Sequence, residues 1–121
     1  MRFLSMIRID ERTTQTPSEQ LMNDMGKLIE EMTRAGVLID TAGLRPTSEG
    51  VRVRLRRGKL STIDGPFTET KEVIGGYAIL EVKSKEEAIE HTRRFLEIHG
   101  EEWDLECEVR QLDEPEPGGE G

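Results

Sequence analysis

The segment 64–72, DGPFTETKE, concentrates side chains that can carry acid–base chemistry around a Gly-Pro turn. A carboxylate such as that of Asp64 can accept a proton or anchor a polar ligand, and the ammonium group of Lys71 can bind an anion. The alternative is structural: Asp64 would bond to its own backbone within the turn, and Phe67 would fill the core. The residues alone leave both interpretations open.

A second candidate is a row of arginines in the segment 50–57, where Arg52, Arg54 and Arg56 alternate with Val51, Val53 and Leu55. Between residues 45 and 59 there are six basic residues and one acid, a local charge of +5. Arginine side chains on a strand can hold a carboxylate or a phosphate. Alternatively, they form a solvated face and pair with Glu106 and Glu108 of another strand.

The chain has two histidines, His91 and His99, and one cysteine, Cys107. Neither histidine has a neighbouring His or Cys that would complete a metal site, so we expect both to be structural. Cys107 alternates inward with Leu105 and Val109, which predicts a buried side chain. Because these residues are isolated, we expect no metal site. No phosphate-binding glycine motif precedes a helix, so we expect no cofactor either.

The overall composition excludes several classes of protein. The chain has 121 residues and a formal net charge of −8, which favours one domain and argues against nucleic-acid and membrane partners. We find no signal peptide and expect a cytoplasmic protein. The domain should span 1–112, because residues 113–121 contain no apolar side chain and are predicted to form a disordered acidic tail.

Two helices must position these residues. Thr16, Pro17 and Glu19 form a helix-start signal, with Thr16 as the N-cap, and an apolar stripe continues to a stop at Gly36. The stripe comprises Leu21, Met22, Met25, Leu28, Ile29, Met32 and Ala35. A second capping box, Ser84 with Glu87, predicts a helix to about residue 98.

The strands are predicted from period-two alternation and short apolar runs. They are expected at residues 3–9, 37–44, 77–83 and 105–110, with a hairpin at 50–63 whose aliphatic face is half-buried. Without the hairpin the order is β-α-β-β-α-β, which is the ferredoxin-like α+β arrangement. Two helices cover only one face of such a sheet, so we expect a second copy of the chain to cover the other, in a homodimer.

The stretch from Asp64-Gly65-Pro66-Phe67 to Gly75-Gly76-Tyr77 resembles the signature of DGPF-type proteins in the YCII-related domain family. The closing Glu108-Val109-Arg110 resembles the last strand of that family. The resemblance implies a ferredoxin-like fold with an inserted hairpin, paired into a dimeric α/β barrel.

The resemblance implies two kinds of function. Some relatives are cofactor-free, lyase-type enzymes with a His–Asp pair; Asp64 is similar in position to the Asp, whereas residues 16–35 contain no histidine. The enzyme hypothesis is a dimer that binds a small, anionic molecule, with Asp64 as catalytic carboxylate, Arg54 and Lys71 as charge partners and Tyr77 as a hydrogen-bonding neighbour. The alternative is a non-enzymatic accessory protein linked to extracytoplasmic-function sigma factor signalling.

Overall fold

The computed structural model describes residues 1–12, 15–67 and 72–114. Within these residues it has six strands, two α-helices and one short 3-10 turn at Thr47–Glu49. The elements are β1 (Arg2–Ile9), α1 (Glu19–Arg34), β2 (Leu38–Gly43), β3 (Val51–Arg56), β4 (Lys59–Asp64), β5 (Val73–Glu81), α2 (Lys85–Glu97) and β6 (Glu106–Gln111). The class is α+β, as the sequence predicts.

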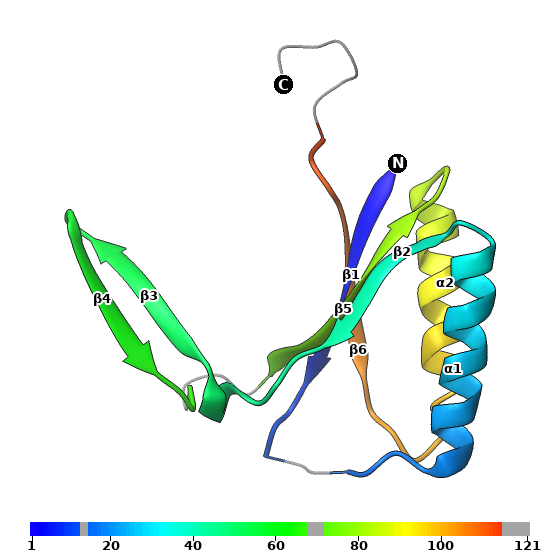
Figure 1. Ribbon diagram of the computed structural model, residues 1–121, viewed down its shortest axis with the longest axis horizontal. Coiled ribbons are helices and arrows are strands. Elements are labelled where there is room, and N and C mark those ends of the chain that lie inside the picture. Colours follow the sequence, from blue (N-terminus) through cyan, green and yellow to red (C-terminus); the bar gives the residue numbers. More distant parts are fainter. Residues whose placement is uncertain (13–14, 68–71, 115–121) are drawn as a thin grey trace.

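Four strands form an antiparallel sheet in the order β2-β5-β1-β6, and β3 pairs only with β4. Both helices lie on the same face of the four-stranded sheet (Figure 1). With β3 and β4 set aside, the element order and the sheet order are consistent with the predicted ferredoxin-like arrangement.

The core lies between this sheet and the helices. In the register of β1 and β5, Phe3 lies opposite Leu80, and both side chains are almost fully buried. They pack in one cluster with Met32 of α1 and Ala88 of α2. Leu4 and Ile79 also lie opposite each other, but on the face of the sheet without helices. Their side chains remain half-buried.

The predicted start of the first helix is wrong by two residues. Ser18, not Thr16, is the N-cap: its backbone is extended, and its Oγ accepts a hydrogen bond from the N–H of Leu21 at 3.0 Å. The predicted apolar stripe is also only partly covered, because Met22 is 63% exposed. The second helix starts as predicted, with the Oγ of Ser84 accepting from the N–H of Glu87.

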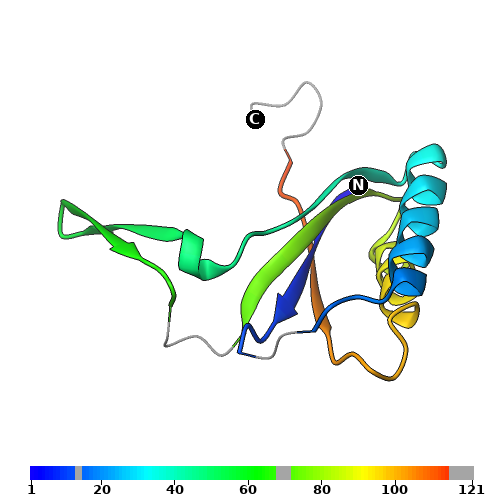
Figure 2. The same cartoon turned by 60° about the horizontal axis from the view of Figure 1, so that its bottom comes forward.

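Strands β3 and β4 form a two-stranded arm, which we define as residues 51–64. Arg57 and Gly58 join the strands with positive φ angles of 51° and 78°, the conformation that lets a two-residue turn follow the twist of the strands. The arm extends away from the sheet in both views (Figures 1 and 2). The predicted half-buried aliphatic face is therefore wrong: Val53 is 65% exposed and Leu55 is 69% exposed.

Two predictions fall on residues that the structure does not describe. Lys71 lies outside the described ranges, and so does most of the predicted tail, residues 115–121. Among the described residues, neither helix has the length and apolar content that a membrane span requires.

Candidate functional site

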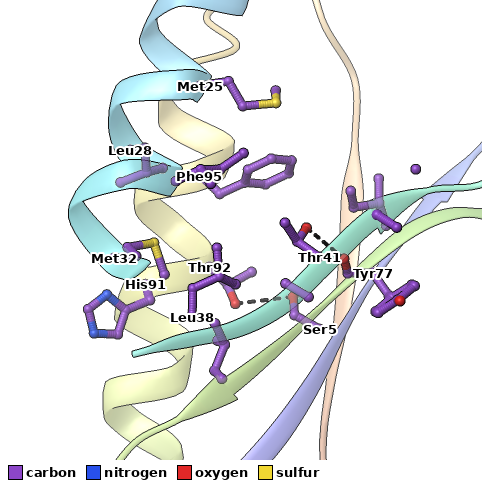
Figure 3. Close-up of a pocket in the computed structure, with 16 residues that line it drawn as sticks. Ser5, Met25, Leu28, Met32, Leu38, Thr41, Tyr77, His91, Thr92 and Phe95 are labelled. Atoms are coloured by element: carbon purple, nitrogen blue, oxygen red, sulfur yellow. Dashed lines mark hydrogen bonds between the residues drawn. The ribbon is translucent and has the colours of Figure 1, made fainter. Parts of the chain in front are cut away.

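A cavity of about 400 Å³ lies between the helices and the helix-covered face of the sheet. Its walls are mainly apolar, and Figure 3 shows side chains of both helices and of the sheet converging on it. They include Met25, Leu28 and Met32 of α1, Leu38 of β2, Leu80 of β5 and Phe95 of α2. A cavity of this size and lining suits a small apolar molecule or an apolar portion of a larger one.

Two buried hydroxyl groups lie in the wall of this cavity. The Oγ of Ser5 on β1 and the Oγ1 of Thr92 on α2 are 3.3 Å apart and share a hydrogen bond (Figure 3). Both residues are less than one-tenth exposed. Each hydroxyl keeps further hydrogen-bonding capacity, because it has one donor and two acceptor positions. The pair can therefore orient a polar atom of an otherwise apolar ligand.

His91 of α2 also lines the cavity and is the imidazole of the lining. Its side chain is 17% exposed, and its Nε2 lies 3.9 Å from the Oε1 of Glu87, one turn earlier on the helix. Its Nδ1 is buried without a hydrogen-bond partner among the described residues. Because this nitrogen is closed off from solvent, it does not face the cavity, and Figure 3 shows the ring directed away from the sheet.

Tyr77 is the only described residue among the predicted site residues that lines the cavity. Its ring lies on the other side of the strand from the helices, as Figure 3 shows, and its hydroxyl donates a hydrogen bond to Oδ2 of Asp40 at 3.0 Å. This hydrogen bond to a carboxylate raises the pKa of Tyr77 above its ordinary value. The phenol is therefore held protonated and directed away from the cavity.

The structure does not bring the other predicted site residues to this cavity. Asp64 ends β4, is exposed and lies opposite Val51, whereas Arg54 is half-buried and lies opposite Ser61. These two pairs are on opposite faces of the arm, because side chains alternate along a strand. Neither Asp64 nor Arg54 lines the cavity between the helices and the sheet.

The loop after β4 is close to the backbone at the base of the arm. The N–H of Gly65 donates to the carbonyl of Gly50 at 2.9 Å, and the bond from Gly65 to Pro66 is cis. A Cβ at Gly65 would lie 1.6 Å from the carbonyl oxygen of Thr47, so only glycine fits here. The Phe67 ring lies 3.9 Å from the guanidinium of Arg52, a cation–π contact rather than the predicted core position.

The base of the arm is also held from the end of β1. Oε2 of Glu11 accepts the backbone N–H of Thr47 at 2.8 Å, and Oε1 accepts its hydroxyl at 2.5 Å. Because one carboxylate holds both groups, the direction in which the arm leaves the body is fixed at this point.

One alternative from the sequence was that the arginines of the arm pair with Glu106 and Glu108 of the last strand. The part of the chain that the structure describes does not show this pairing. Glu106 and Glu108 form ion pairs with Arg8 of β1, which also lies 3.9 Å from Glu72. Glu108 and Arg8 lie on neighbouring strands, with Glu106 directly opposite Arg8 in the register. Cys107 is half-buried, and burial raises the pKa of its thiol.

Comparison with known proteins identifies the family of the chain. The model of the YCII-related domain matches residues 1–96, most of the chain. The chain belongs to the YCII-related domain family. It is also similar to an uncharacterised protein of Rhizobium meliloti (strain 1021), with 33% identity over 75 residues, which is 62% of this chain and 60% of that protein. The chain therefore covers less than two thirds of this relative.

Sequence reasoning missed the cavity of this YCII-related protein, although two signals pointed to it. Ser5 interrupts the apolar run of the first strand, and Thr92 stands within the apolar stripe of the second helix. A hydroxyl at a core position needs a partner, and these two supply it to each other. Among the described residues, no group of three or more His, Cys, Asp or Glu side chains could hold a metal ion.

Proposed function

We propose that this YCII-related protein binds a small, mainly apolar molecule in the cavity between its helices and its sheet. The single observation that carries the proposal is the cavity itself: about 400 Å³, walled by aliphatic, Met and Phe side chains. A concave, mainly apolar hollow of this size with a few polar groups is the usual form of a small-molecule site. The Ser5–Thr92 hydroxyl pair would fix the orientation of the ligand.

We further propose that the protein is a homodimer that forms a dimeric α/β barrel through the sheet face without helices. This face carries Leu4, Met6 and Ile79, which are half-buried in the single chain. An apolar sheet face that no helix covers is typical of an interface. The barrel would place one cavity on each side of the dimer, outside the paired sheets.

The catalytic part of the enzyme hypothesis stays a prediction. Asp64 as the carboxylate of a cofactor-free, lyase-like reaction would have to act outside the cavity, with Arg54 and Lys71 binding an anion there. The accessory role in sigma factor signalling rests only on the family resemblance. We propose ligand binding in the cavity ahead of both, because the residues that line it converge on one space.

The experiment uses the fluorescent probe anilinonaphthalene sulfonate (ANS), which has an apolar aromatic ring system and one negatively charged sulfonate. Ala78 lines the cavity from β5, so Ala78→Leu fills part of it with a larger side chain. We expect the full-length wild-type protein to bind ANS and Ala78→Leu to raise its dissociation constant by about tenfold or more. Fluorescence titration measures both constants.

The matched control is Ala35→Leu, the same change at an exposed helix end outside the cavity, which should leave ANS binding unchanged. Equal ANS binding by wild type and Ala78→Leu, with both proteins folded by circular dichroism, would contradict the cavity as the binding site. If Ala78→Leu does not fold, Met25→Trp takes its place, because it puts a larger side chain at a half-buried position of the lining and should also weaken ANS binding.

A further inference from the structure

The arm, residues 51–64, has two faces of different chemistry. The register places Val51, Val53, Leu55 and Leu60 on one face and Arg52, Arg54, Arg56 and Lys59 on the other. On the aliphatic face, exposure rises from 54% at Val51 to 75% at Leu60. A two-stranded hairpin with an uncovered apolar face is only marginally stable in water, so this arm needs a surface to pack on.

The body of the same chain does not supply that surface. Figures 1 and 2 show the arm extending from the sheet on the side away from the helices, with no other described element beside it. The contacts of Glu11 with Thr47 tie the base of the arm to the end of β1, whereas the bond of Gly65 to Gly50 closes the base of the arm on itself. The arm therefore projects past the sheet face that we propose as the dimer interface.

The charge distribution indicates what the arm meets. The segment 45–59 has a charge of +5, whereas the rest of the chain has 11 basic and 24 acidic residues, a charge of −13. Contact between the two arms would bring their cations together. Contact of each arm with the body of the other copy brings opposite charges together twice, and a two-fold axis makes both contacts identical.

We infer that the arm is an intersubunit clasp: the aliphatic face of each arm packs on the body of a second copy of this chain, and its cations attract it to that acidic body. This inference rests on the proposed dimer and adds the arm to its interface. The segment that sequence analysis singled out for its arginines then acts in assembly.

The experiment measures the dimer dissociation constant of the full chain by sedimentation equilibrium. Leu55→Lys removes apolar contact while it adds to the positive charge of the arm, so any weakening cannot come from lost charge attraction. We expect the dissociation constant to rise about tenfold or more. Met22→Lys is the matched control, because Met22 is 63% exposed on α1, and it should stay within about twofold of wild type.

Charge is tested separately. Arg56→Glu, at the arm end opposite Lys59, should weaken the dimer by several-fold in low salt, and added salt should shrink the difference between this variant and wild type. Lys27→Glu on the exposed side of α1 is the control and should have a smaller effect.

The outcomes separate the two proposals. If wild type stays monomeric at all concentrations, the dimer and the clasp are both wrong, while the ligand-binding cavity is unaffected. If wild type dimerises and Leu55→Lys dimerises equally well, only the clasp is wrong. Hydrogen exchange of wild type gives a readout without variants: amides of residues 51–64 should become protected as the protein concentration rises, and unchanged exchange in a dimer would also overturn the clasp.

Discussion

Tyr77 lies on β5, a strand that lines the cavity, but its hydroxyl is directed to the other face of the sheet and not to the predicted site. Its hydroxyl donates to Asp40 of the neighbouring strand, so the phenol and the carboxylate satisfy each other on the face without helices. Because the hydrogen bond requires the protonated phenol, it raises the pKa of Tyr77 above its ordinary value of 10.0.

The sign of this shift predicts an alkaline effect. A pKa that is higher in the folded than in the unfolded state contributes stability below the unfolded pKa, and the contribution is lost as the pH rises through the folded pKa. Tyr77 is the only tyrosine, so an ultraviolet absorbance titration reports this group alone. We expect its midpoint above that of the urea-unfolded chain, and Asp40→Asn should lower it. Asp104→Asn, an exposed control, should not move it.

Gly65 is the residue at which the backbone tolerates no side chain. The missing Cβ would lie 1.6 Å from the carbonyl oxygen of Thr47, and backbone atoms cannot turn aside as a flexible side chain can. We expect Gly65→Ala to destabilise the base of the arm by about 1–3 kcal/mol, typical of overpacking. Hydrogen exchange at the Gly50 and Gly65 amides would measure it.

The control for this substitution is Gly26→Ala. Gly26 lies within α1 with open space where its Cβ would be, so alanine should raise the free energy of unfolding by up to about 1 kcal/mol. Equal and small effects of the two variants would show that the approach of Gly65 to Thr47 is not tight.

At the scale of elements, the start of α1 separates the sequence prediction from the structure. Thr16 and Ser18 are both good N-cap residues. The side-chain oxygen of either one could accept a hydrogen bond from a backbone N–H three residues later, in the first turn of a helix. In the structure, the side chain of Ser18 bonds to Leu21, and Leu21 is buried in the core. The packing of the helix thus selects between two caps that local propensity does not distinguish.

This choice can be measured by urea unfolding. Ser18→Ala should lower the free energy of unfolding by about 1 kcal/mol, because it leaves an N–H of the first turn without its partner. Thr16→Ala should change it by less than about 0.5 kcal/mol, as expected of an exposed residue outside a cap. The reverse order of the two effects would restore Thr16 as the cap.

At the scale of the whole molecule, the two faces of the four-stranded sheet differ in what covers them. The helices cover the face of Phe3 and Leu80, whereas the face of Leu4 and Ile79 has no cover within the chain. In the proposed dimer this second face meets its copy, so a charge there must be dehydrated on association.

Ile79→Lys tests this face. We expect its dimer dissociation constant, from light scattering, to exceed that of wild type by about tenfold or more. Ile89→Lys introduces the same change on α2, at a side chain that is 40% exposed, and should leave association unchanged. A dimer that tolerates Ile79→Lys as well as Ile89→Lys would place the interface elsewhere.

The local patterns of this chain determined most of its elements. Period-two alternation predicts β3, β5 and β6, and the capping box at Ser84 and Glu87 predicts α2. Both signals are local, because alternation depends on residues two apart and a capping box on residues three apart. With the arm set aside, the order of the elements along the chain predicts the ferredoxin-like arrangement, and the observed sheet order is consistent with it. The family resemblance from the DGPF segment agrees with the matching family model.

Contacts between distant residues were decided only by the tertiary structure. Ser5 and Thr92 are 87 positions apart, and no pattern within either segment shows that their hydroxyls meet in the wall of a cavity. The same holds for the arm. Alternation predicts that β3 has an aliphatic face, but whether other parts of the protein cover that face depends on the direction in which the strands leave the body. Burial is a property of the whole arrangement, and for this reason the sequence predicts the strands of the arm and not their exposure.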